Sequence, residues 1–488
     1  QYVINADVSD SELLTQFVSS TLPSDLVEKL RAFVRVVDKP LAIRSSSKLE
    51  DSYYQPFAGV YSTYMIPHTE NEDLQLRLLG NAIKSVYASV YYAASKAYIT
   101  ATANVISEEK MGIVIQEVSG SEDGGYFFPT LSGTARSVNF YPVGYEKPEE
   151  GIAKIAFGLG KAVVDGDQVL RFSPAHPRNV IQTSTPELAM RDTQKVMYAL
   201  NLQPGRFKTS VDDAVNLERI PVSECGMFKD FSKVVSTYDT YNSRIVDTPF
   251  ADGPKVVTFA HVLRYNTFPL ADIIKQLLAI SVDEMQSNIE IEFAADLQNN
   301  LFHLLQIRPI SADGMHTEVN WSQVDTYGAL VLSDSSLGTG WIPGVTDIVY
   351  VRKDTFDNMR TVEIAAEISA LNSRLRQEGR SYVLIGYGRW GSSIPTLGIP
   401  VVWSDISEAK ALVECGMDGF RVDPSQGSHF FQNLTSFNVG YISTDAVDHE
   451  KLASLPAIEE SCFLRHIRLE NALQICVDGR TGKGVIKL

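Results

Sequence analysis

The sequence predicts an α/β (α+β) protein with two main units, on three observations. Apolar residues recur at helix spacing and predict a long amphipathic helix with one core face, made by Leu79, Ile83, Val86 and Val90. Short β-branched runs such as LAIRSSS and MGIVIQ predict strands, and we expect the second strand to be buried. After about residue 316 the pattern restarts as strand TDIVYV, a helix over about 361–378 and strand SYVLIG, which predicts domains at 1–315 and 316–488.

Composition is typical of a folded globular protein, with 44% hydrophobic and 21% charged residues in 488. The net charge of −16 argues against a nucleic-acid binder, because that affinity depends on Lys and Arg displacing counterions. The four cysteines are widely spaced and form no CxxC, so we expect neither a zinc site nor a disulfide framework. The cysteine pattern therefore favours a reducing compartment.

Targeting signals are absent from the sequence pattern. No apolar stretch approaches the roughly 18 residues of a membrane span, and the start lacks the basic and apolar regions of a signal peptide. We therefore expect a cytoplasmic protein with no membrane partner. Because the chain starts at Gln1 rather than Met, we also expect that material upstream has been removed.

The run SNIEIEFAADLQNNLFHLLQIRPI predicts a β-hairpin, because two alternating strands flank a polar turn. If the turn is centred near residue 299, Glu292 lies opposite Gln306 and Glu290 lies opposite Arg308. Alternation puts all four side chains on one face, which is too polar for a core. The pattern alone leaves open whether this face meets solvent or lines a site.

The segment LAIRSSSKLEDSYYQPFAGVYSTY combines residue types that phosphate binding uses. Arg44 on a strand offers fork-like donors, Gly59 lets backbone N–H groups approach a ligand, and Thr63 adds a hydroxyl. By composition alone, an ordinary strand and loop explains the segment equally well.

The loop GYGRWG matches the spacing of a dinucleotide-binding fingerprint through Gly386, Gly388 and Gly391. That fingerprint needs a helix to begin at once, whereas the following SSIPTLGIPV has two prolines and extended character. We favour a structural glycine loop that carries Arg389 and Trp390.

His429 lies in DPSQGSHFFQNL, just before a predicted helix, where a phosphorylated histidine would meet free backbone N–H groups. One loop histidine among eight is expected by chance, so we favour a structural role and keep a phosphoacceptor role as the alternative.

Together, these motifs resemble the ATP-grasp, PEP/pyruvate-binding domain of the phosphoenolpyruvate synthase and pyruvate phosphate dikinase family. RSSSKLEDSYYQPFAG resembles the family's arginine-bearing RSSA/ED…FAG motif, and GIVIQEV its VVQ strand. AFGLGKAVVDG is similar to its GLGE loop, and IEFAAD…LLQIRP to its IEWA…LQARP pair. The order is kept over roughly residues 40–310.

The resemblance implies a catalytic role for two arginines. Arg44, with Gly59 and Thr63, would hold the phosphates of ATP, and Arg308 would contact the phosphoryl group that is transferred.

The remaining roles that the resemblance implies concern the base, the ribose and the metal. Gln116 and Val118 would face the adenine and Glu117 would reach the ribose. Glu292 and Gln306 would ligate Mg²⁺, since few protein ligands suffice when ATP supplies phosphate oxygens.

The chain departs from the family pattern in four places. No glycine-rich lysine motif precedes Arg44, so we expect either that the N-terminal lobe is truncated or that its triphosphate lysine is lost. Lys161 replaces the glutamate of GLGE, and His429 keeps only the centre of the carrier motif, although 316–488 stands in the place of the phosphohistidine domain. The chain also has no room for the family's TIM barrel, so we expect that alone it does not form phosphoenolpyruvate.

The sequence therefore predicts the ATP-binding, Mg²⁺-dependent phosphotransferase portion of a phosphoenolpyruvate-synthase-like or pyruvate-phosphate-dikinase-like protein. It would transfer a phosphoryl group from ATP to an acceptor, a histidine in the family, and meet pyruvate or phosphoenolpyruvate through domains that this chain lacks. The alternative is a catalytically inactive nucleotide-sensing or interaction module on a degenerate ATP-grasp fold.

Overall fold

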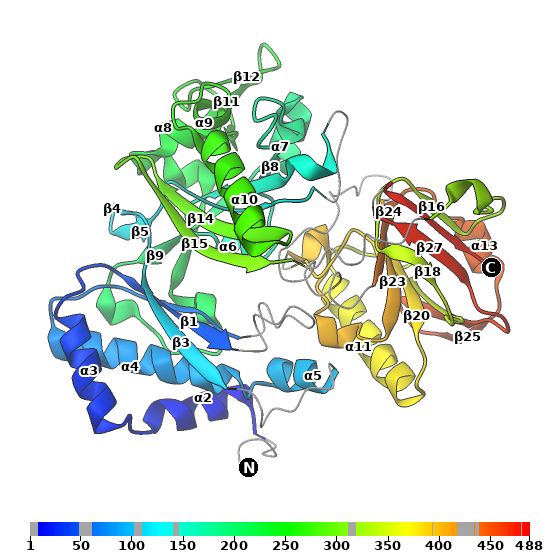
Figure 1. Ribbon diagram of the computed structural model, residues 1–488, viewed down its shortest axis with the longest axis horizontal. Coiled ribbons are helices and arrows are strands. Elements are labelled where there is room, and N and C mark those ends of the chain that lie inside the picture. Colours follow the sequence, from blue (N-terminus) through cyan, green and yellow to red (C-terminus); the bar gives the residue numbers. More distant parts are fainter. Residues whose placement is uncertain are drawn as a thin grey trace.

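The computed structural model shows a mixed α/β protein built from several sheets (Figure 1). It describes residues 8–47, 61–101, 110–139, 146–310, 319–392, 394–416, 434, 439–479 and 481–488. Within this part of the chain, no helix is long and apolar enough to cross a membrane.

In the described residues of the N-terminal lobe, helix α4 packs against a three-stranded antiparallel sheet of order β2-β1-β3, and α2 and α3 pack against α4. The helix predicted after Asn71 is confirmed, because the Asn71 side chain accepts a hydrogen bond from the backbone N–H of Leu74 and Leu79 lies in the core. The elements are α2 (Asp10–Ser19), α3 (Ser24–Val34), α4 (Glu72–Ser89), α5 (Ala93–Ala101), β1 (Leu41–Ser47), β2 (Tyr64–Ile66) and β3 (Met111–Glu117).

The expectation that MGIVIQ forms a buried strand is wrong. Strand β3 forms, but it lies at the edge of its sheet and alternates between partly buried and exposed positions, with Val114 39% exposed. A short β-branched run predicts a strand, whereas its burial depends on which strands flank it in space. The open face of β3 is what brings Gln116 to a cavity.

A second sheet has five antiparallel strands in the order β15-β14-β6-β7-β8 and packs against helix α10 (Leu270–Met285). Phe293 and Ile291 on β14 point into the core beneath it, together with residues of β7 and α10. The strands are β6 (Leu131–Arg136), β7 (Ile152–Phe157), β8 (Leu170–Phe172), β14 (Ile289–Asp296) and β15 (Leu301–Pro309).

Smaller elements surround this sheet. Two further antiparallel sheets have the orders β10-β9-β5-β4 and β12-β11-β13. Their strands are β4 (Ser121–Asp123), β5 (Tyr126–Phe128), β9 (Val196–Asn201), β10 (Leu217–Pro221), β11 (Val235–Asp239), β12 (Arg244–Val246) and β13 (Lys255–Val257). The short helices are α6 (Lys161–Val164), α7 (Pro186–Asp192), α8 (Phe231–Val234) and α9 (Ala260–Leu263).

The predicted hairpin register is confirmed where the polar residues lie. Glu290 pairs with Arg308 and Glu292 pairs with Gln306 on β14 and β15. Beyond Glu292 the register shifts, so that Phe293 pairs with Leu304 and Leu305 is the extra residue of a β-bulge. The turn is thus centred slightly before the predicted position. Because the bulge adds one residue to β15, the pairs beyond it, Glu292 with Gln306 and Glu290 with Arg308, are nevertheless the predicted ones.

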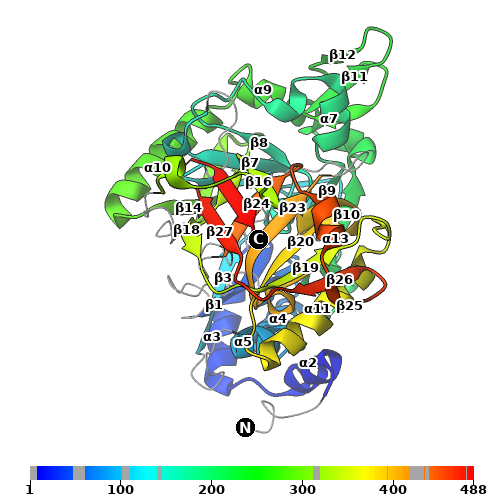
Figure 2. The same cartoon turned by 90° about the vertical axis from the view of Figure 1, so that its right-hand side faces the viewer.

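The described residues from 319 to 488 form what we call the C-terminal part. It contains a seven-stranded sheet of order β17-β24-β23-β20-β19-β26-β25, in which the four strands from β24 to β19 are parallel (Figure 2). Helix α11 (Thr361–Gln377) confirms the predicted helix. The sheet strands are β17 (Ser336–Leu337), β19 (Asp347–Val351), β20 (Tyr382–Tyr387), β23 (Ala409–Cys415), β24 (Gly440–Thr444), β25 (Ala457–Glu460) and β26 (Leu464–Arg468).

A four-stranded antiparallel sheet of order β16-β28-β27-β18 accompanies it, and helix α13 (His449–Ser454) follows β24. Its strands are β16 (Val331–Ser333), β18 (Thr339–Ile342), β27 (Gln474–Asp478) and β28 (Lys483–Lys487). The predicted boundary at 315/316 lies outside the described residues and stays a prediction.

The loop GYGRWG has the structural role that the sequence favoured. Gly388 and Gly391 have φ values of 73° and 71°, and the following described residues form β21 (Arg389–Trp390), a 3₁₀ turn and β22 (Gly398–Ile399) rather than an α-helix. A Cβ on Gly386 would lie 2.4 Å from the ring of Trp390, which is buried. The glycines therefore make room for a buried indole and give the loop its turns.

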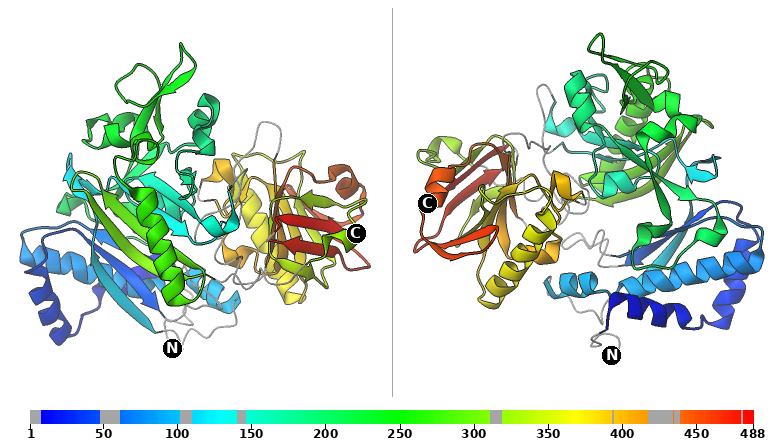
Figure 3. Two further views of the ribbon diagram at one scale, coloured as in Figure 1. Left: turned by 45° about the horizontal axis from the view of Figure 1, so that its top comes forward. Right: turned by 180° about the vertical axis from the view of Figure 1, so that it is seen from behind.

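The C-terminal part shares an apolar core with the N-terminal lobe. Figure 3 shows the two lying side by side, and Val90, Tyr98 and Ile99 belong to the same buried cluster as the strands β19, β20 and β23. Helix α5 packs against the 3₁₀ turn Trp403–Asp405. This contact fixes the position of the C-terminal part beside the lobe.

Candidate functional site

A cavity of ≈ 350 Å³ lies between the N-terminal sheet and the five-stranded sheet. Strands β1 and β3 supply one wall, and β6 and β14 supply the other. Of the predicted nucleotide and metal residues that the structure describes, the cavity is lined by Arg44, Thr63, Gln116, Glu117, Val118 and Glu292.

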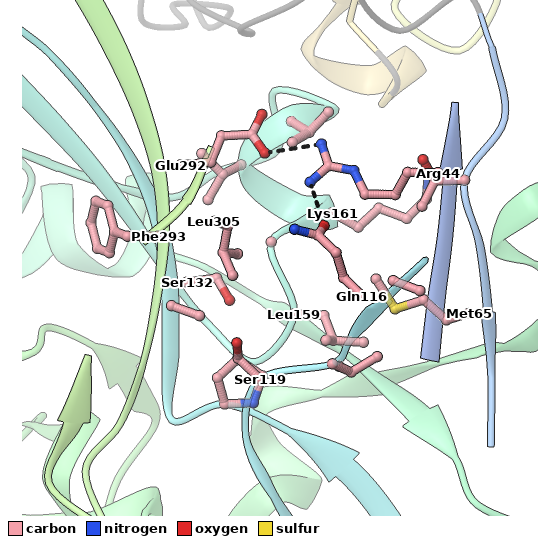
Figure 4. Close-up of a pocket in the computed structure, with 18 of the residues that line it drawn as sticks. Arg44, Met65, Gln116, Ser119, Ser132, Leu159, Lys161, Glu292, Phe293 and Leu305 are labelled. Carbon is pink, nitrogen blue, oxygen red and sulfur yellow. Dashed lines mark hydrogen bonds and ion pairs between the residues drawn. The ribbon is translucent and has the colours of Figure 1, made fainter. Parts of the chain in front are cut away.

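Arg44 joins the two walls at one end of the cavity (Figure 4). Its Nη2 donates to Oε1 of Gln306 at 2.8 Å and to Oε2 of Glu292 at 3.4 Å, and its Nη1 donates to Oε1 of Gln116 at 3.4 Å. The Glu292 side chain is 15% exposed and the Arg44 side chain 27%. Residues far apart in the sequence thus converge on one partly shielded charged cluster.

The other end of the cavity is mainly apolar and suits a planar base. Figure 4 shows Met65 and Leu159 there, together with Ser119 and Ser132, away from the guanidinium of Arg44. Gly158, with φ 87°, turns the chain so closely past β9 that a Cβ would lie 2.6 Å from the carbonyl oxygen of Tyr198. The apolar lining residues include Ala42, Met65, Val118, Leu159, Val163 and Leu217.

Lys161, the residue that departs from GLGE, lines the cavity inside an ion cluster. Its Nζ lies 2.9 Å from Asp165 and 3.9 Å from Asp213, and Asp213 also accepts the backbone N–H of Thr63 at 2.9 Å. Burial raises the pKa of Asp213, and Lys161 opposes that rise. Burial alone would lower the pKa of Lys161, but the two carboxylates raise it above its usual value. The loop lysine is therefore held charged and fastens Thr63 through Asp213.

Arg308 lies one same-face step beyond Gln306, as predicted, but it does not line the cavity. Its Nε donates to Glu290 at 3.0 Å, and Arg136 binds the other oxygen of the same carboxylate. Burial alone would raise the pKa of Glu290, but the two arginines lower it to about 2. Glu290 is thus an ionised anchor between two guanidinium groups.

The three residues expected at the base and ribose, Gln116, Glu117 and Val118, each have a contact within the N-terminal lobe. The Gln116 carboxamide contacts Arg44, which places it at the charged end. The exposed Glu117 is 3.5 Å from Lys39, and the backbone N–H of the buried Val118 donates to Pro40 at 2.8 Å. Gly59 and His429 lie outside the described residues, so their roles stay predictions.

Sequence reasoning missed several lining residues. Asp213 lies in a 3₁₀ turn with no motif around it, and Leu305 reaches the cavity only because of the bulge. Ser132 and Thr134 lie two residues apart in LSGTAR, so both side chains share one face of β6 and line the cavity. This alternation of hydroxyl side chains is the sequence signal from which they could have been predicted.

At the end of the cavity where Arg44 lies, the side-chain oxygens would hold a hard cation such as Mg²⁺ only if a bound ligand supplied further oxygens. A carboxylate and an amide oxygen are ligand types that Mg²⁺ accepts. Among the described residues, no group of three or more His, Cys, Asp or Glu side chains is arranged to hold a metal by itself. A magnesium site here would therefore depend on oxygens supplied by a phosphate.

A mixed α/β chain whose cavity joins an apolar slot to an arginine, a carboxylate and an amide has the make-up of a nucleotide-binding protein. Residues 5–326, well over half of the 488-residue chain, match the family described as pyruvate phosphate dikinase, AMP/ATP-binding domain. The chain belongs to this family, which confirms the predicted resemblance.

Two curated relatives match a shorter segment. The chain is 33% identical over 153 residues to an uncharacterized phosphotransferase, YvkC, of Bacillus subtilis, covering 31% of this chain and 16% of that protein. It is 28% identical over 165 residues to a phosphoenolpyruvate synthase of Aeropyrum pernix, covering 32% of this chain and 18% of that protein. The aligned segments thus span less than a fifth of either relative, and both relatives support an ATP-binding phosphotransferase family.

Proposed function

We propose that the cavity binds Mg-ATP on an ATP-grasp domain and that the chain transfers a phosphoryl group from ATP to an acceptor, a histidine by analogy with the family. The observation that carries the proposal is the contact of Arg44 with Glu292 and Gln306, of which Arg44 and Glu292 line one end of the cavity. The opposite end is apolar, so a nucleotide would lie with its base there and its phosphates toward Arg44.

Each side chain at the charged end has a role that its chemistry allows. Arg44 would turn its guanidinium from Glu292 and Gln306 to the phosphate oxygens, because charge-assisted bonds to phosphate are stronger than its 3.4 Å contact with Glu292. The freed carboxylate and amide would then hold Mg²⁺, which neutralises charge on the phosphates. Thr63 would donate its hydroxyl to the same phosphates.

Calorimetric titration with Mg-ATP and Mg-ADP tests the binding step. We expect binding to the wild-type chain and a loss of about tenfold or more in Arg44→Ala, since each charge-assisted hydrogen bond contributes about 1.5–3 kcal/mol. Arg35→Ala is the matched control, because Arg35 is exposed and pairs with Glu72 at 2.8 Å on the outside of the lobe. Absence of binding to the wild-type protein, or equal affinity in Arg44→Ala, would contradict the proposal.

A second candidate is nucleotide sensing without transfer. It is favoured by Arg308, which bonds Glu290 rather than lining the cavity. Transfer of labelled phosphate from ATP to the full-length protein or its acceptor separates the two candidates. Label transfer supports the phosphotransferase, whereas tight binding with no transfer supports the sensor.

We also propose a cytoplasmic location. All four cysteines are free, and three of them are buried, which is typical of a protein made in a reducing compartment. Non-reducing mass spectrometry of protein purified under air-free conditions should find four free thiols.

A further inference from the structure

Three side chains that carry oxygen form a row across neighbouring strands of the five-stranded sheet. Gln306 on β15 pairs with Glu292 on β14, and Glu292 pairs in turn with Thr134 on β6. Directly paired residues point to the same face of a sheet, and neighbouring strands are about 4.8 Å apart. Glu292 and Thr134 both line the cavity. The row therefore places a hydroxyl group beside Glu292, on the side opposite Gln306.

The hydroxyl of Thr134 differs from the two hydroxyls that precede it at every second residue. Thr130, just before β6, donates from Oγ1 to the carboxylate of Asp230. Ser132 donates from Oγ to the carbonyl oxygen of Gly158 at 2.8 Å. Within the part of the chain that the structure describes, the hydroxyl of Thr134 forms no hydrogen bond with another residue. The first two hydroxyls thus hold neighbouring segments, whereas the third keeps its donor and its acceptors for a ligand.

Burial directs this hydroxyl to the contents of the cavity. Thr134 is only 6% exposed, and it lines the cavity, so the little surface that it keeps opens there. Buried polar groups are satisfied by protein, by ordered water or by a ligand, because leaving them without a partner destabilises the fold. The partner of the Thr134 hydroxyl is therefore a molecule bound in the cavity.

The position of Thr134 selects the part of the ligand that it would contact. Its neighbour Glu292 lies at the end of the cavity where Arg44 contacts both Glu292 and Gln306. Phosphates and Mg²⁺ would lie at this end in the proposed complex, and Mg²⁺ usually keeps several water ligands. The hydroxyl oxygen of threonine is attached to Cβ, whereas the carboxylate of Glu292 extends two carbons further. Thr134 is therefore suited to a hydrogen bond with the Mg²⁺-phosphate group rather than to a direct bond with the metal.

We propose that Thr134 is a further binding residue of the nucleotide site and that its hydroxyl forms a hydrogen bond with the Mg²⁺-phosphate group. The inference deepens the proposed function and rests on it. The bonding partner is either a phosphate oxygen or a water molecule on the metal, and these two sources give different results below.

The test compares Thr134→Val and Thr134→Ser with the wild-type protein by calorimetric titration with ATP, once with Mg²⁺ and once with EDTA. Valine keeps the β-branched shape and removes the hydroxyl, whereas serine keeps the hydroxyl. Thr15→Val is the matched control, because the hydroxyl of Thr15 lies on the exposed helix α2 and donates to the carbonyl oxygen of Ser11 at 2.8 Å. Circular dichroism melting checks that each variant is folded.

We expect Thr134→Val to lose about tenfold in Mg-ATP affinity at an unchanged melting temperature, and Thr134→Ser and Thr15→Val to bind like the wild type. A similar loss in EDTA indicates a bond to a phosphate oxygen, whereas a loss confined to Mg²⁺ indicates a metal-bound water. Unchanged Mg-ATP affinity in Thr134→Val, or equal losses in both Thr134 variants, would overturn the inference. Failure of the wild type to bind Mg-ATP would instead contradict the proposed function, and this inference would fall with it.

Discussion

Two carboxylates of β14, Glu290 and Glu292, lie two residues apart on one face and have opposite surroundings. Glu290 is buried and clamped by Arg136 and Arg308, whereas Glu292 is partly exposed and has a 3.4 Å contact with Arg44. A carboxylate locked between two guanidinium groups is suited to holding the sheet together. One that faces a cavity can exchange its partner for a ligand, so the two residues should respond differently to substitution.

Substituting Glu290→Gln should destabilise the protein by about 3–5 kcal/mol, because it leaves two buried arginines without their charged partner. The pKa of Glu290 is lowered to about 2 from 4.5, so its contribution to stability is present above pH 4.5 and is lost as the pH falls toward about 2. Urea unfolding over this pH range measures both effects. The wild type should lose more stability than the variant on acidification.

Glu363→Gln is the control for that experiment, because Glu363 is an exposed carboxylate paired with Arg360. Its unfolding should stay close to that of the wild type at every pH. Equal stability of wild type and Glu290→Gln at neutral pH would show that the buried ion cluster does not stabilise the fold.

Substituting Glu292→Ala should abolish ATP turnover in a full-length protein and leave the thermal midpoint nearly unchanged, because its side chain borders a cavity rather than the core. A Mg²⁺ titration of ATP binding in the same variant should show a weakened metal dependence. Retained turnover with normal Mg²⁺ dependence would remove Glu292 from the metal site.

At the scale of elements, the β-bulge of β15 lies directly beside Gln306, the residue that contacts Arg44. Leu305 is the extra residue between Leu304 and Gln306, and it lines the cavity. Bulges bend a strand and increase its twist. The position of Gln306 relative to Arg44 therefore depends on a residue that takes no regular place in the ladder.

Deleting Leu305 should keep the pairs on both sides of it, Phe293 with Leu304 and Glu292 with Gln306. We expect the variant to fold and to lose about tenfold in nucleotide affinity, since the bend that aims Gln306 is removed. Circular dichroism and calorimetry check the two outcomes, with Leu305→Ala as the control that keeps the bulge. Unchanged affinity after the deletion would show that the bulge does not position the site.

Much of the local structure could be predicted from the sequence, because it depends on neighbours in the chain. LAIRSSS gave β1 at its observed limits, and alternation around a polar turn gave the pairing of Glu292 with Gln306. Burial of β3, the position of Asp213 and the bulge could not be predicted, since each depends on segments that meet only in the folded protein. The pairing of Glu292 with Gln306 could be predicted because a motif and a strand pattern coincide there.

At the scale of the whole molecule, the junction between the N-terminal lobe and the C-terminal part is an apolar core rather than a linker. Val90, Tyr98 and Ile99 are all at most 5% exposed in a cluster that they share with the C-terminal sheet. Arg389 adds a polar contact between the C-terminal part and the five-stranded sheet. We therefore expect the C-terminal part and the lobe to unfold together.

All four tryptophans, Trp321, Trp341, Trp390 and Trp403, lie in the C-terminal part, so fluorescence excited selectively in tryptophan rather than in the 21 tyrosines reports on that part alone. Substituting Ile99→Ala, in the lobe, should shift the fluorescence-monitored unfolding by about 2–5 kcal/mol, because it opens a cavity in the shared core. Leu79→Ala, which is also buried but lies in the lobe's own core, should shift the fluorescence and circular dichroism transitions equally, because the two parts are expected to unfold together. If Ile99→Ala leaves the fluorescence-monitored transition unchanged, the C-terminal part folds independently of helix α5.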